Sequence, residues 1–233
     1  MTLISQNGGG PPRILVVVAH PDDETLGAGG TVARFAGQGS EVWVCVVCDG
    51  VTARHDQVDR QKQCAQRACD LLGVRKVVFC DLPDQRLDTL SLVDVITPIE
   101  RCVAELRPDF VLTHFEEDVN QDHGVVFNAA MVATRPSPGS SVHGVLCFET
   151  ASSTEWAAPF AGSTFAPNFF VDISDTVAKK IEAMNVYADA YASEVRSYPH
   201  PRSLEAIEVY AKRHGITTGV HAAEPFMLVR GAI

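Results

Sequence analysis

The chain has 233 residues, of which 46% are hydrophobic and 21% charged, and its formal net charge is −10. This length suits one large domain better than two small ones. The negative charge and scattered basic residues argue against a nucleic-acid partner, because phosphate binding requires clustered Lys and Arg.

Targeting signals and membrane spans are not visible in the sequence. No run approaches the ~18–20 apolar residues that a membrane span needs. Residues 1–12 form a Gly- and Pro-rich lead, which we expect to be flexible, without the basic and apolar regions of a signal peptide. The seven cysteines lie mostly in apolar segments, so we expect reduced thiols in a cytoplasmic protein.

The first part of the chain alternates short apolar runs with helical stretches. The predicted elements, in chain order, are a strand at Arg13–Ala19, a helix at Thr25–Gly37, a strand at Glu41–Cys48, a helix at Val58–Leu72, a strand at Lys76–Cys80, a helix at Leu92–Leu106, a strand at Asp109–Thr113 and a helix at His123–Thr134. The strands are continuously apolar and β-branched, which is typical of parallel strands buried on both faces. Strand–helix alternation with right-handed crossovers predicts an α/β fold with an open, mostly parallel sheet flanked by helices.

The second part of the chain is more mixed. It contains predicted strands at Gly144–Glu149, Phe169–Ile173 and Pro225–Val229, and predicted helices at Thr176–Tyr191 and Leu204–His214. The linker-like stretch at residues 136–141 is too short to separate independent domains. We therefore expect a single domain over residues 1–233, Rossmann-like with a mixed C-terminal extension.

Polar residues follow each of the first four predicted strands. They are residues 20–24 (HPDDE), 49–54 (DGVTAR), 81–86 (DLPDQR) and 114–123 (HFEEDVNQDH). In an open α/β sheet, ligands bind at the carboxyl ends of the strands. We therefore expect the chemistry of the protein at this edge of the sheet.

The segment after the first strand favours a metal site. His20 and Asp23 can both face one ion across the turn at Pro21, and zinc accepts imidazole nitrogen and carboxylate oxygen. His123, at the start of the helix after the fourth strand, is the natural third ligand. Asp22 is then free to act as a general base on a water molecule whose pKa zinc would lower toward ~7. Helix capping also produces Asp-Asp-Glu before a helix, so both interpretations stay open on the residues alone.

Other motifs favour structure over chemistry. The glycines at residues 27–30 (GAGG) do not fit a dinucleotide-binding pattern and more plausibly allow close helix–strand packing. Cys45 and Cys48 lie within a strand and are interpreted as core residues. Ser152-Ser153 lacks the surroundings of a nucleophilic serine. The remaining histidines, His55, His143, His214 and His221, are most simply surface or loop residues.

The segment at residues 19–27 (AHPDDETLG) resembles the signature of the PIG-L/LmbE-like family of N-acetylsugar deacetylases. The resemblance extends to residues 120–123 (NQDH), which are similar to the second metal motif of the family. Residues 152–156 (SSTEW) and 198–203 (YPHPRS) resemble segments of a bacterial branch, so the likeness covers nearly the whole chain.

The resemblance implies a Rossmann-like fold and one catalytic zinc ion per chain. By position, His20, Asp23 and His123 match the zinc ligands of the family, and Asp22 matches the general base. The implied substrates are N-acetylglucosamine units on lipids, thiol glycosides, nucleotide or antibiotic sugars and chito-oligosaccharides. The family also often forms homo-oligomers, including trimers and hexamers.

Asn120 departs from the family pattern, because many members have a histidine at this position that assists the transition state. An asparagine can donate a hydrogen bond to an oxyanion but cannot deliver a proton at neutral pH. His114 or His200 could replace the missing acid, or Asp22 could act as both base and acid. Our hypothesis is that Asp22 carries the proton and that His200 or His114 orients it.

Substrate contacts are predicted near the strand ends, where a hydroxyl-rich sugar needs bidentate donors and carboxylate acceptors. The candidates are Arg54, Asp84, Arg86 and Arg202, with Trp156 as a residue that could stack on a sugar face. The leading hypothesis is thus a zinc-dependent N-deacetylase of a small N-acetylated sugar. The alternatives are a zinc amidase acting on a larger amide, such as a thiol conjugate, and a non-catalytic binding protein with the same fold.

Overall fold

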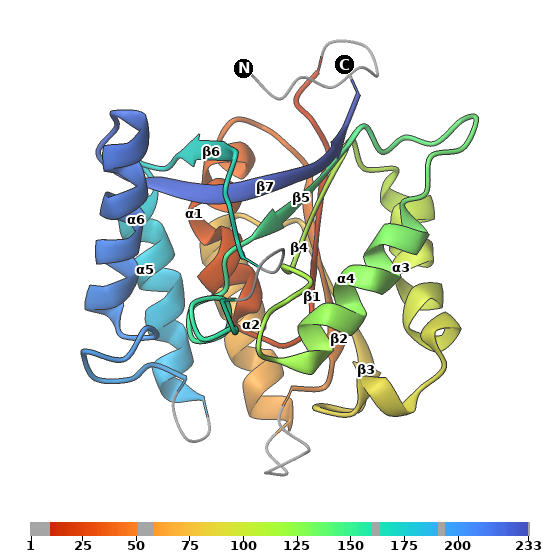
Figure 1. Cartoon of the computed structure of the whole chain (residues 1–233), viewed down its shortest axis with the longest axis horizontal. Coiled ribbons are helices and arrows are strands. Elements are labelled where there is room, and N and C mark those ends of the chain that lie inside the picture. Colours follow the sequence, from red (N-terminus) through yellow and green to blue (C-terminus); the bar gives the residue numbers. More distant parts are fainter. Residues whose placement is uncertain (1–9, 51–57, 160–163, 191–193, 233) are drawn as a thin grey trace.

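The computed structural model describes residues 10–50, 58–159, 164–190 and 194–232. These residues form a seven-stranded sheet in the order β3-β2-β1-β4-β5-β7-β6, with helices on both faces (Figure 1). The strands are β1 (Ile14–Val18), β2 (Val42–Cys48), β3 (Lys76–Leu82), β4 (Phe110–Thr113), β5 (Gly144–Phe148), β6 (Phe169–Asp172) and β7 (Ala223–Gly231). The helices are α1 (Asp23–Gly37), α2 (Val58–Leu72), α3 (Leu92–Leu106), α4 (Gln121–Ala133), α5 (Val177–Val186) and α6 (Leu204–Thr218), with short 3₁₀ turns η1 (Leu87–Thr89) and η2 (Tyr187–Asp189).

The sheet is parallel in its first part and antiparallel at one edge. β1 pairs in parallel with β2 and β4, β2 with β3, and β4 with β5. β7 pairs antiparallel with both β5 and β6. The prediction of an open, mostly parallel α/β sheet with a mixed C-terminal part is therefore confirmed.

Two hydrophobic clusters cover the two faces of the sheet. Ile14, Val16 and Val18 of β1 face one cluster together with α1, α2, α5 and α6, whereas Leu15 and Val17 face α3 and α4. All five residues of β1 are buried, because side chains alternate between two faces that are both covered. This burial explains why the strand is continuously apolar and why it lies at the centre of the sheet.

Close packing of α1 requires two of its glycines. A Cβ atom on Gly27 would lie 2.2 Å from the Phe148 ring, and one on Gly30 would lie 2.7 Å from Ile173. The interpretation of these glycines as packing residues is confirmed. Their close approach fixes the start of α1, and hence the HPDDE segment, against the end of β5.

Several predicted boundaries are wrong. α1 begins at Asp23 and α4 at Gln121, each two residues before the predicted start. α6 continues to Thr218 instead of ending at His214. The helix predicted over Thr176–Tyr191 ends at Val186 and tightens into η2, and Tyr191 lies outside the described residues.

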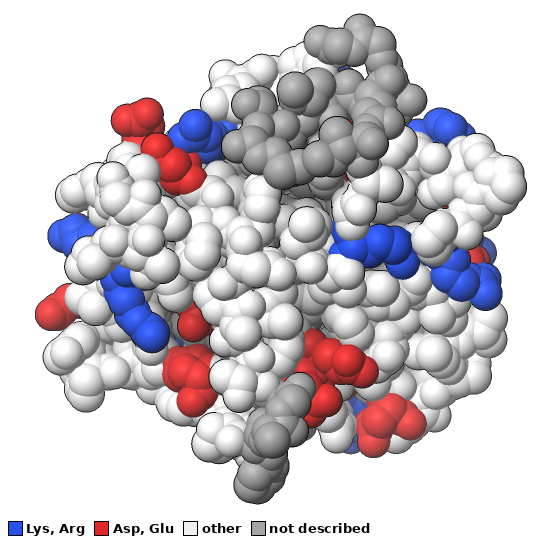
Figure 2. All heavy atoms as spheres, turned by 45° about the horizontal axis from the view of Figure 1, so that its top comes forward, with Lys and Arg blue, Asp and Glu red and all other residues white. Residues whose placement is uncertain are grey.

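Charged side chains are dispersed over the surface in Figure 2. On the face shown, Lys and Arg are interspersed with Asp and Glu among uncharged residues, and no continuous basic patch is visible. No helix within the described ranges is long and apolar enough to cross a membrane.

Candidate active site

The ends of β1 and β4 lie side by side at the centre of the sheet. His20 follows β1, His114 follows β4, and the start of α4 contributes His123. The chain crosses to β2 and β3 on one side of β1 and to β4 and β5 on the other, which makes this point a topological switch. Such points form the ligand-binding crevice of open α/β sheets.

Asp23 lies between the two predicted histidine ligands. Its Oδ2 atom is 3.2 Å from Nδ1 of His20 and 3.4 Å from Nε2 of His123. One donor atom from each of the three buried residues lies within 4.8 Å of the other two. A tetrahedral zinc ion with bonds of about 2.0–2.1 Å holds its nitrogen and oxygen ligands about 3.3–3.4 Å apart. The structure thus brings the predicted ligands together at spacings that suit zinc.

Two donor atoms of this set lack a hydrogen bond. Oδ1 of Asp23 and Nε2 of His123 are buried and have no hydrogen-bond partner among the described residues. A buried polar atom left unpaired costs about 1–3 kcal/mol. A metal ion would compensate for this cost, so the donor set fits the zinc ion that the sequence predicts.

Asp118 orients His123. Its Oδ2 atom lies 2.8 Å from Nδ1 of His123, and its Oδ1 atom accepts a hydrogen bond of 2.6 Å from Thr154. With Nδ1–H donating to Asp118, the Nε2 lone pair of His123 faces Asp23. Carboxylates commonly orient metal-binding histidines in this way. The sequence analysis assigned no role to Asp118, although it belongs to the polar segment after the fourth strand.

Asp22 has an unusual backbone conformation, with a φ angle of 110°. Such a conformation costs about 1–3 kcal/mol and often marks a functional position. The carboxylate of Glu24 holds the turn, since it accepts bonds from the Asp22 backbone N–H at 3.0 Å and the Tyr187 hydroxyl at 2.7 Å. Glu24 therefore fixes the position of Asp22 in addition to supporting the start of the helix.

Arg202 binds Asp22 directly. Its Nη1 atom donates to Oδ2 of Asp22 at 2.9 Å and to Oε2 of Glu194 at 2.7 Å, and its Nε atom donates to Ser152 at 2.8 Å. Burial raises the pKa of Asp22 well above its usual value, and the Arg202 charge acts against this rise. Arg202, predicted to contact substrate, thus lies against the predicted base.

His114 is fully buried and has a partner for each ring nitrogen. Nε2 accepts a hydrogen bond of 2.8 Å from the Ala19 N–H, and Nδ1 lies 3.3 Å from the Thr150 hydroxyl. Its ring stacks on His123 with centroids 3.8 Å apart. Burial and the neighbouring His123 lower the pKa of His114 well below its usual value. These contacts suit a neutral ring that packs against a metal ligand.

Asn120 and His200, two candidates for the catalytic machinery, make structural contacts. Asn120 caps α4, because its side-chain oxygen accepts a bond of 3.1 Å from the Asp122 N–H. Nδ1 of His200 accepts a bond of 3.1 Å from the backbone N–H of Arg202, and its ring contacts Trp156 edge to face at 5.5 Å. Trp156 is 53% exposed, which suits a residue at the rim of a site.

The remaining predicted substrate residues lie in different surroundings. Oδ1 of Asp84 is 3.3 Å from Nε2 of His20, so Asp84 adjoins a predicted metal ligand. Arg86 is exposed and precedes η1. Arg54 lies outside the described residues.

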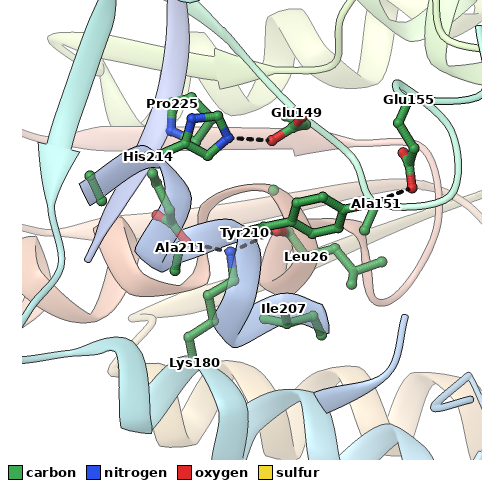
Figure 3. Close-up of a pocket in the computed structure, with 13 residues that line it drawn as sticks. Leu26, Glu149, Ala151, Glu155, Lys180, Ile207, Tyr210, Ala211, His214 and Pro225 are labelled. Carbon is green, nitrogen blue, oxygen red and sulfur yellow. Dashed lines mark hydrogen bonds and ion pairs between the residues drawn. The ribbon is translucent and has the colours of Figure 1, made fainter. Parts of the chain in front are cut away.

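A separate pocket lies between α1, α6 and β7 (Figure 3). Its lining includes Tyr210, Lys180 and an ion pair of 3.0 Å between His214 and Glu149. His214 is buried and lies within α6, so its interpretation as a surface or loop residue is wrong. None of the predicted catalytic or metal residues lines this pocket, although Leu26 and Gly27 of its lining closely follow the HPDDE segment.

Comparison with known proteins identifies the family. The family model described as "PIG-L: GlcNAc-PI de-N-acetylase" matches residues 15–134. The uncharacterized deacetylase YaiS of Escherichia coli K12 is 30% identical over 167 residues, which cover 70% of this chain and 82% of YaiS. The chain therefore belongs to the PIG-L family, as the sequence motifs indicated.

Further similarities, one in sequence and one in fold, extend over almost the whole chain. Diacetylchitobiose deacetylase of Thermococcus kodakarensis is 26% identical over 94% of this chain and 84% of its own length. The crystal structure of GalB, the 4-carboxy-2-hydroxymuconate hydratase from Pseudomonas putida KT2440, matches with a TM-score of 0.75 and 22% identity over 95% of this chain and 98% of GalB. Because the second protein is a hydratase, the function must be argued from the site and not from the fold.

Proposed function

We propose that the protein is a zinc-dependent hydrolase that removes the N-acetyl group from an N-acetylglucosamine-type sugar or its conjugate. The observation that carries this proposal is the buried set of His20, Asp23 and His123, in which two donor atoms have no hydrogen-bond partner. The deacetylase names of YaiS and of the Thermococcus relative support the reaction type. The name of the Thermococcus relative and the family description support an N-acetylated sugar as the substrate class.

The three ligands would hold one zinc ion per chain. When bound there, zinc supplies Lewis-acid chemistry, which makes a water molecule acidic near neutral pH and polarises the amide carbonyl. Asp118 keeps the Nε2 lone pair of His123 directed at the ion. Asp122 acts in the same way on His20, because its Oδ2 atom lies 3.2 Å from Nε2 and so leaves Nδ1 for the ion.

Asp22 moves the proton. Arg202 binds one carboxylate oxygen of Asp22, which leaves the other free to accept a proton from the attacking water. The same carboxyl then delivers this proton to the nitrogen of the leaving amine. The contacts support Arg202 as the residue that orients Asp22. His200 would contribute indirectly, by accepting a hydrogen bond from the backbone N–H of Arg202.

Asp22 is the better candidate for the acid than His114. Both ring nitrogens of His114 have partners, and one of them accepts a backbone hydrogen bond. Protonation of His114 would break that bond. Asn120, as the cap of α4, remains available to donate its amide N–H to the oxygen that becomes negative.

We also propose a single domain, since α6 and β7 of the C-terminal part pack on α5 and β5 of the sheet that carries the site. Arg54, Asp84, Arg86 and Trp156 remain our candidates for substrate contact. A homo-oligomer, trimeric or hexameric, and a cytoplasmic location stay predictions.

A substrate panel tests this function. Zinc-loaded protein is incubated with free, nucleotide-linked, lipid-linked and oligomeric N-acetylglucosamine and with an acetylated thiol conjugate, and released acetate is measured. The proposal predicts acetate from a sugar substrate and none from the zinc-loaded Asp22→Asn variant. Acetate or a larger acid from the thiol conjugate alone would favour the amidase, and no hydrolysis by a zinc-loaded protein would contradict the proposal.

A further inference from the structure

The two ring nitrogens of His20 face two different groups of ligands. Nδ1 faces Asp23 of the proposed catalytic set. Nε2 lies 3.2 Å from Oδ2 of Asp122 and 3.3 Å from Oδ1 of Asp84. Asp122 is fully buried, and Asp84 is 5% exposed.

Cys48 completes this second group. It is the last residue of β2, next to the end of β1, where its N–H donates to the Ala19 carbonyl at 2.8 Å. Its fully buried sulfur lies 3.5 Å from Oδ2 of Asp122. One donor atom from each of His20, Cys48 and Asp122 lies within 4.8 Å of the other two. The sequence analysis placed Cys48 in the core and did not connect it with a site.

The spacing of these donors matches a zinc coordination shell. Zinc bonds of about 2.0–2.1 Å to nitrogen and oxygen and about 2.3 Å to sulfur place tetrahedral N···O pairs about 3.3 Å and S···O pairs about 3.6 Å apart. The corresponding distances are 3.2 Å from His20 to Asp122 and 3.5 Å from Cys48 to Asp122. Asp84 contacts the same His20 nitrogen at 3.3 Å, beside this group of three donors.

We propose that His20 Nε2, Cys48 and Asp122, here called the Cys48 set, form a second metal site for a thiolate-binding divalent ion such as Zn²⁺ or Cd²⁺. Coordination releases the thiol proton, and the proton on Nε2 where present, to solvent. No oxidation state changes. The thiolate distinguishes this set from the catalytic one, which has only nitrogen and oxygen donors.

The two sets compete for one imidazole. A neutral imidazole has a single lone pair, so an ion on Nε2 leaves a proton on Nδ1 and removes His20 from the catalytic set. Excess zinc should therefore inhibit the enzyme. This consequence rests on the proposed function, whereas metal binding by the Cys48 set does not.

Cobalt distinguishes the two sets, because thiolate–Co²⁺ coordination gives an intense near-ultraviolet charge-transfer band that nitrogen and oxygen ligands do not give. Metal-free protein is titrated with Co²⁺ while absorbance is recorded. The proposal predicts that the band develops in the wild type and in Cys45→Ser, a control for a buried thiol on the same strand, and is lost in Cys48→Ser. Absence of the band in the wild type at excess Co²⁺ would overturn the proposal without relying on any variant. A band that persists in Cys48→Ser would do the same.

Activity gives a second readout. The zinc concentration that halves acetate release should rise by about tenfold or more in Cys48→Ser. Loss of a residue that only hydrogen-bonds to a metal ligand already lowers metal affinity by about 10–100-fold, and Cys48 would be a ligand itself. Equal zinc inhibition of both proteins would contradict the competition for His20. A cobalt–thiolate band in a protein that releases no acetate would support the Cys48 set while contradicting the proposed deacetylase.

Discussion

Replacement of Arg202 by glutamine tests how Asp22 is held. Arg202 Nη1 lies 2.9 Å from Asp22 and 2.7 Å from Glu194, and Asp22 is 2% exposed. Removal of one partner of a buried ion pair costs about 3–5 kcal/mol. The guanidinium and Glu194 are about one-fifth exposed, so we expect the lower end of this range.

The loss of Arg202 should also lower kcat, because it should raise the pKa of Asp22 further. Burial raises this pKa and Arg202 opposes the rise, so the glutamine variant should hold Asp22 protonated at neutral pH. A protonated carboxyl cannot accept a proton from water. Loss of general-base catalysis typically costs about 10²–10⁴-fold, so we expect kcat near neutral pH to fall by about 100-fold. The acid limb of the rate profile should move to higher pH, so activity should recover as pH rises.

The assay is acetate release, with kcat and KM measured across pH for the wild type, Arg202→Gln and Arg202→Lys. Lysine keeps the positive charge and should recover part of the loss in kcat. Zinc content and Tm are measured in parallel to exclude loss of metal or of the fold. A raised KM with unchanged kcat would show that Arg202 contacts the sugar and does not orient Asp22.

Three further variants and one control variant test other features of the structure. Asp118→Asn should weaken zinc binding by about 10–100-fold in a chelator competition, and unchanged affinity would contradict the orienting role of Asp118. Asp22→Asn should abolish acetate release while zinc stays bound, and retained turnover would remove Asp22 as the base. Gly27→Ala should lower the free energy of unfolding by about 1–3 kcal/mol or more in a urea titration, because its Cβ would lie 2.2 Å from Phe148. Gly37→Ala is the control, because it lies at the end of the same helix with no atom within 4 Å of the new Cβ, and it should raise the free energy of unfolding by about 0.5–1 kcal/mol. Equal effects of the two substitutions would contradict the role of close packing at Gly27.

The central elements could be predicted because their surroundings are uniform. β1 and β2 are buried on both faces, so their sequences are continuously apolar. α2 and α3 have the predicted bounds, since Gly73 follows the first and Arg107-Pro108 follows the second.

Tertiary packing explains why α6 extends beyond its predicted end. The predicted helix ends at His214, directly before Gly215. Instead, Gly215 lies inside the helix and allows close approach of the chain, since a Cβ there would be 2.6 Å from the Val220 carbonyl oxygen. A glycine that stops a helix and a glycine that packs inside one look alike in a single sequence.

The candidate site was predictable where it depends on strand ends. His20, Asp23 and His123 follow or adjoin the ends of neighbouring parallel strands, and the structure brings them together. The contact between Arg202 and Asp22 joins residues 180 positions apart, which no local pattern encodes. Cys48 was missed for a related reason, because its neighbour Asp122 comes from another part of the chain.

Zinc content and acetate release, measured on the same preparation, test whether hydrolysis depends on zinc bound at the proposed catalytic set. The account predicts about one tightly bound zinc per chain at the His20, Asp23 and His123 set. Chelation should remove both the tightly bound zinc and activity, readded zinc should restore both, and His123→Ala should lack activity and bind zinc more weakly. Undiminished acetate release from protein with less than about 0.3 zinc per chain after metal loading would contradict the account.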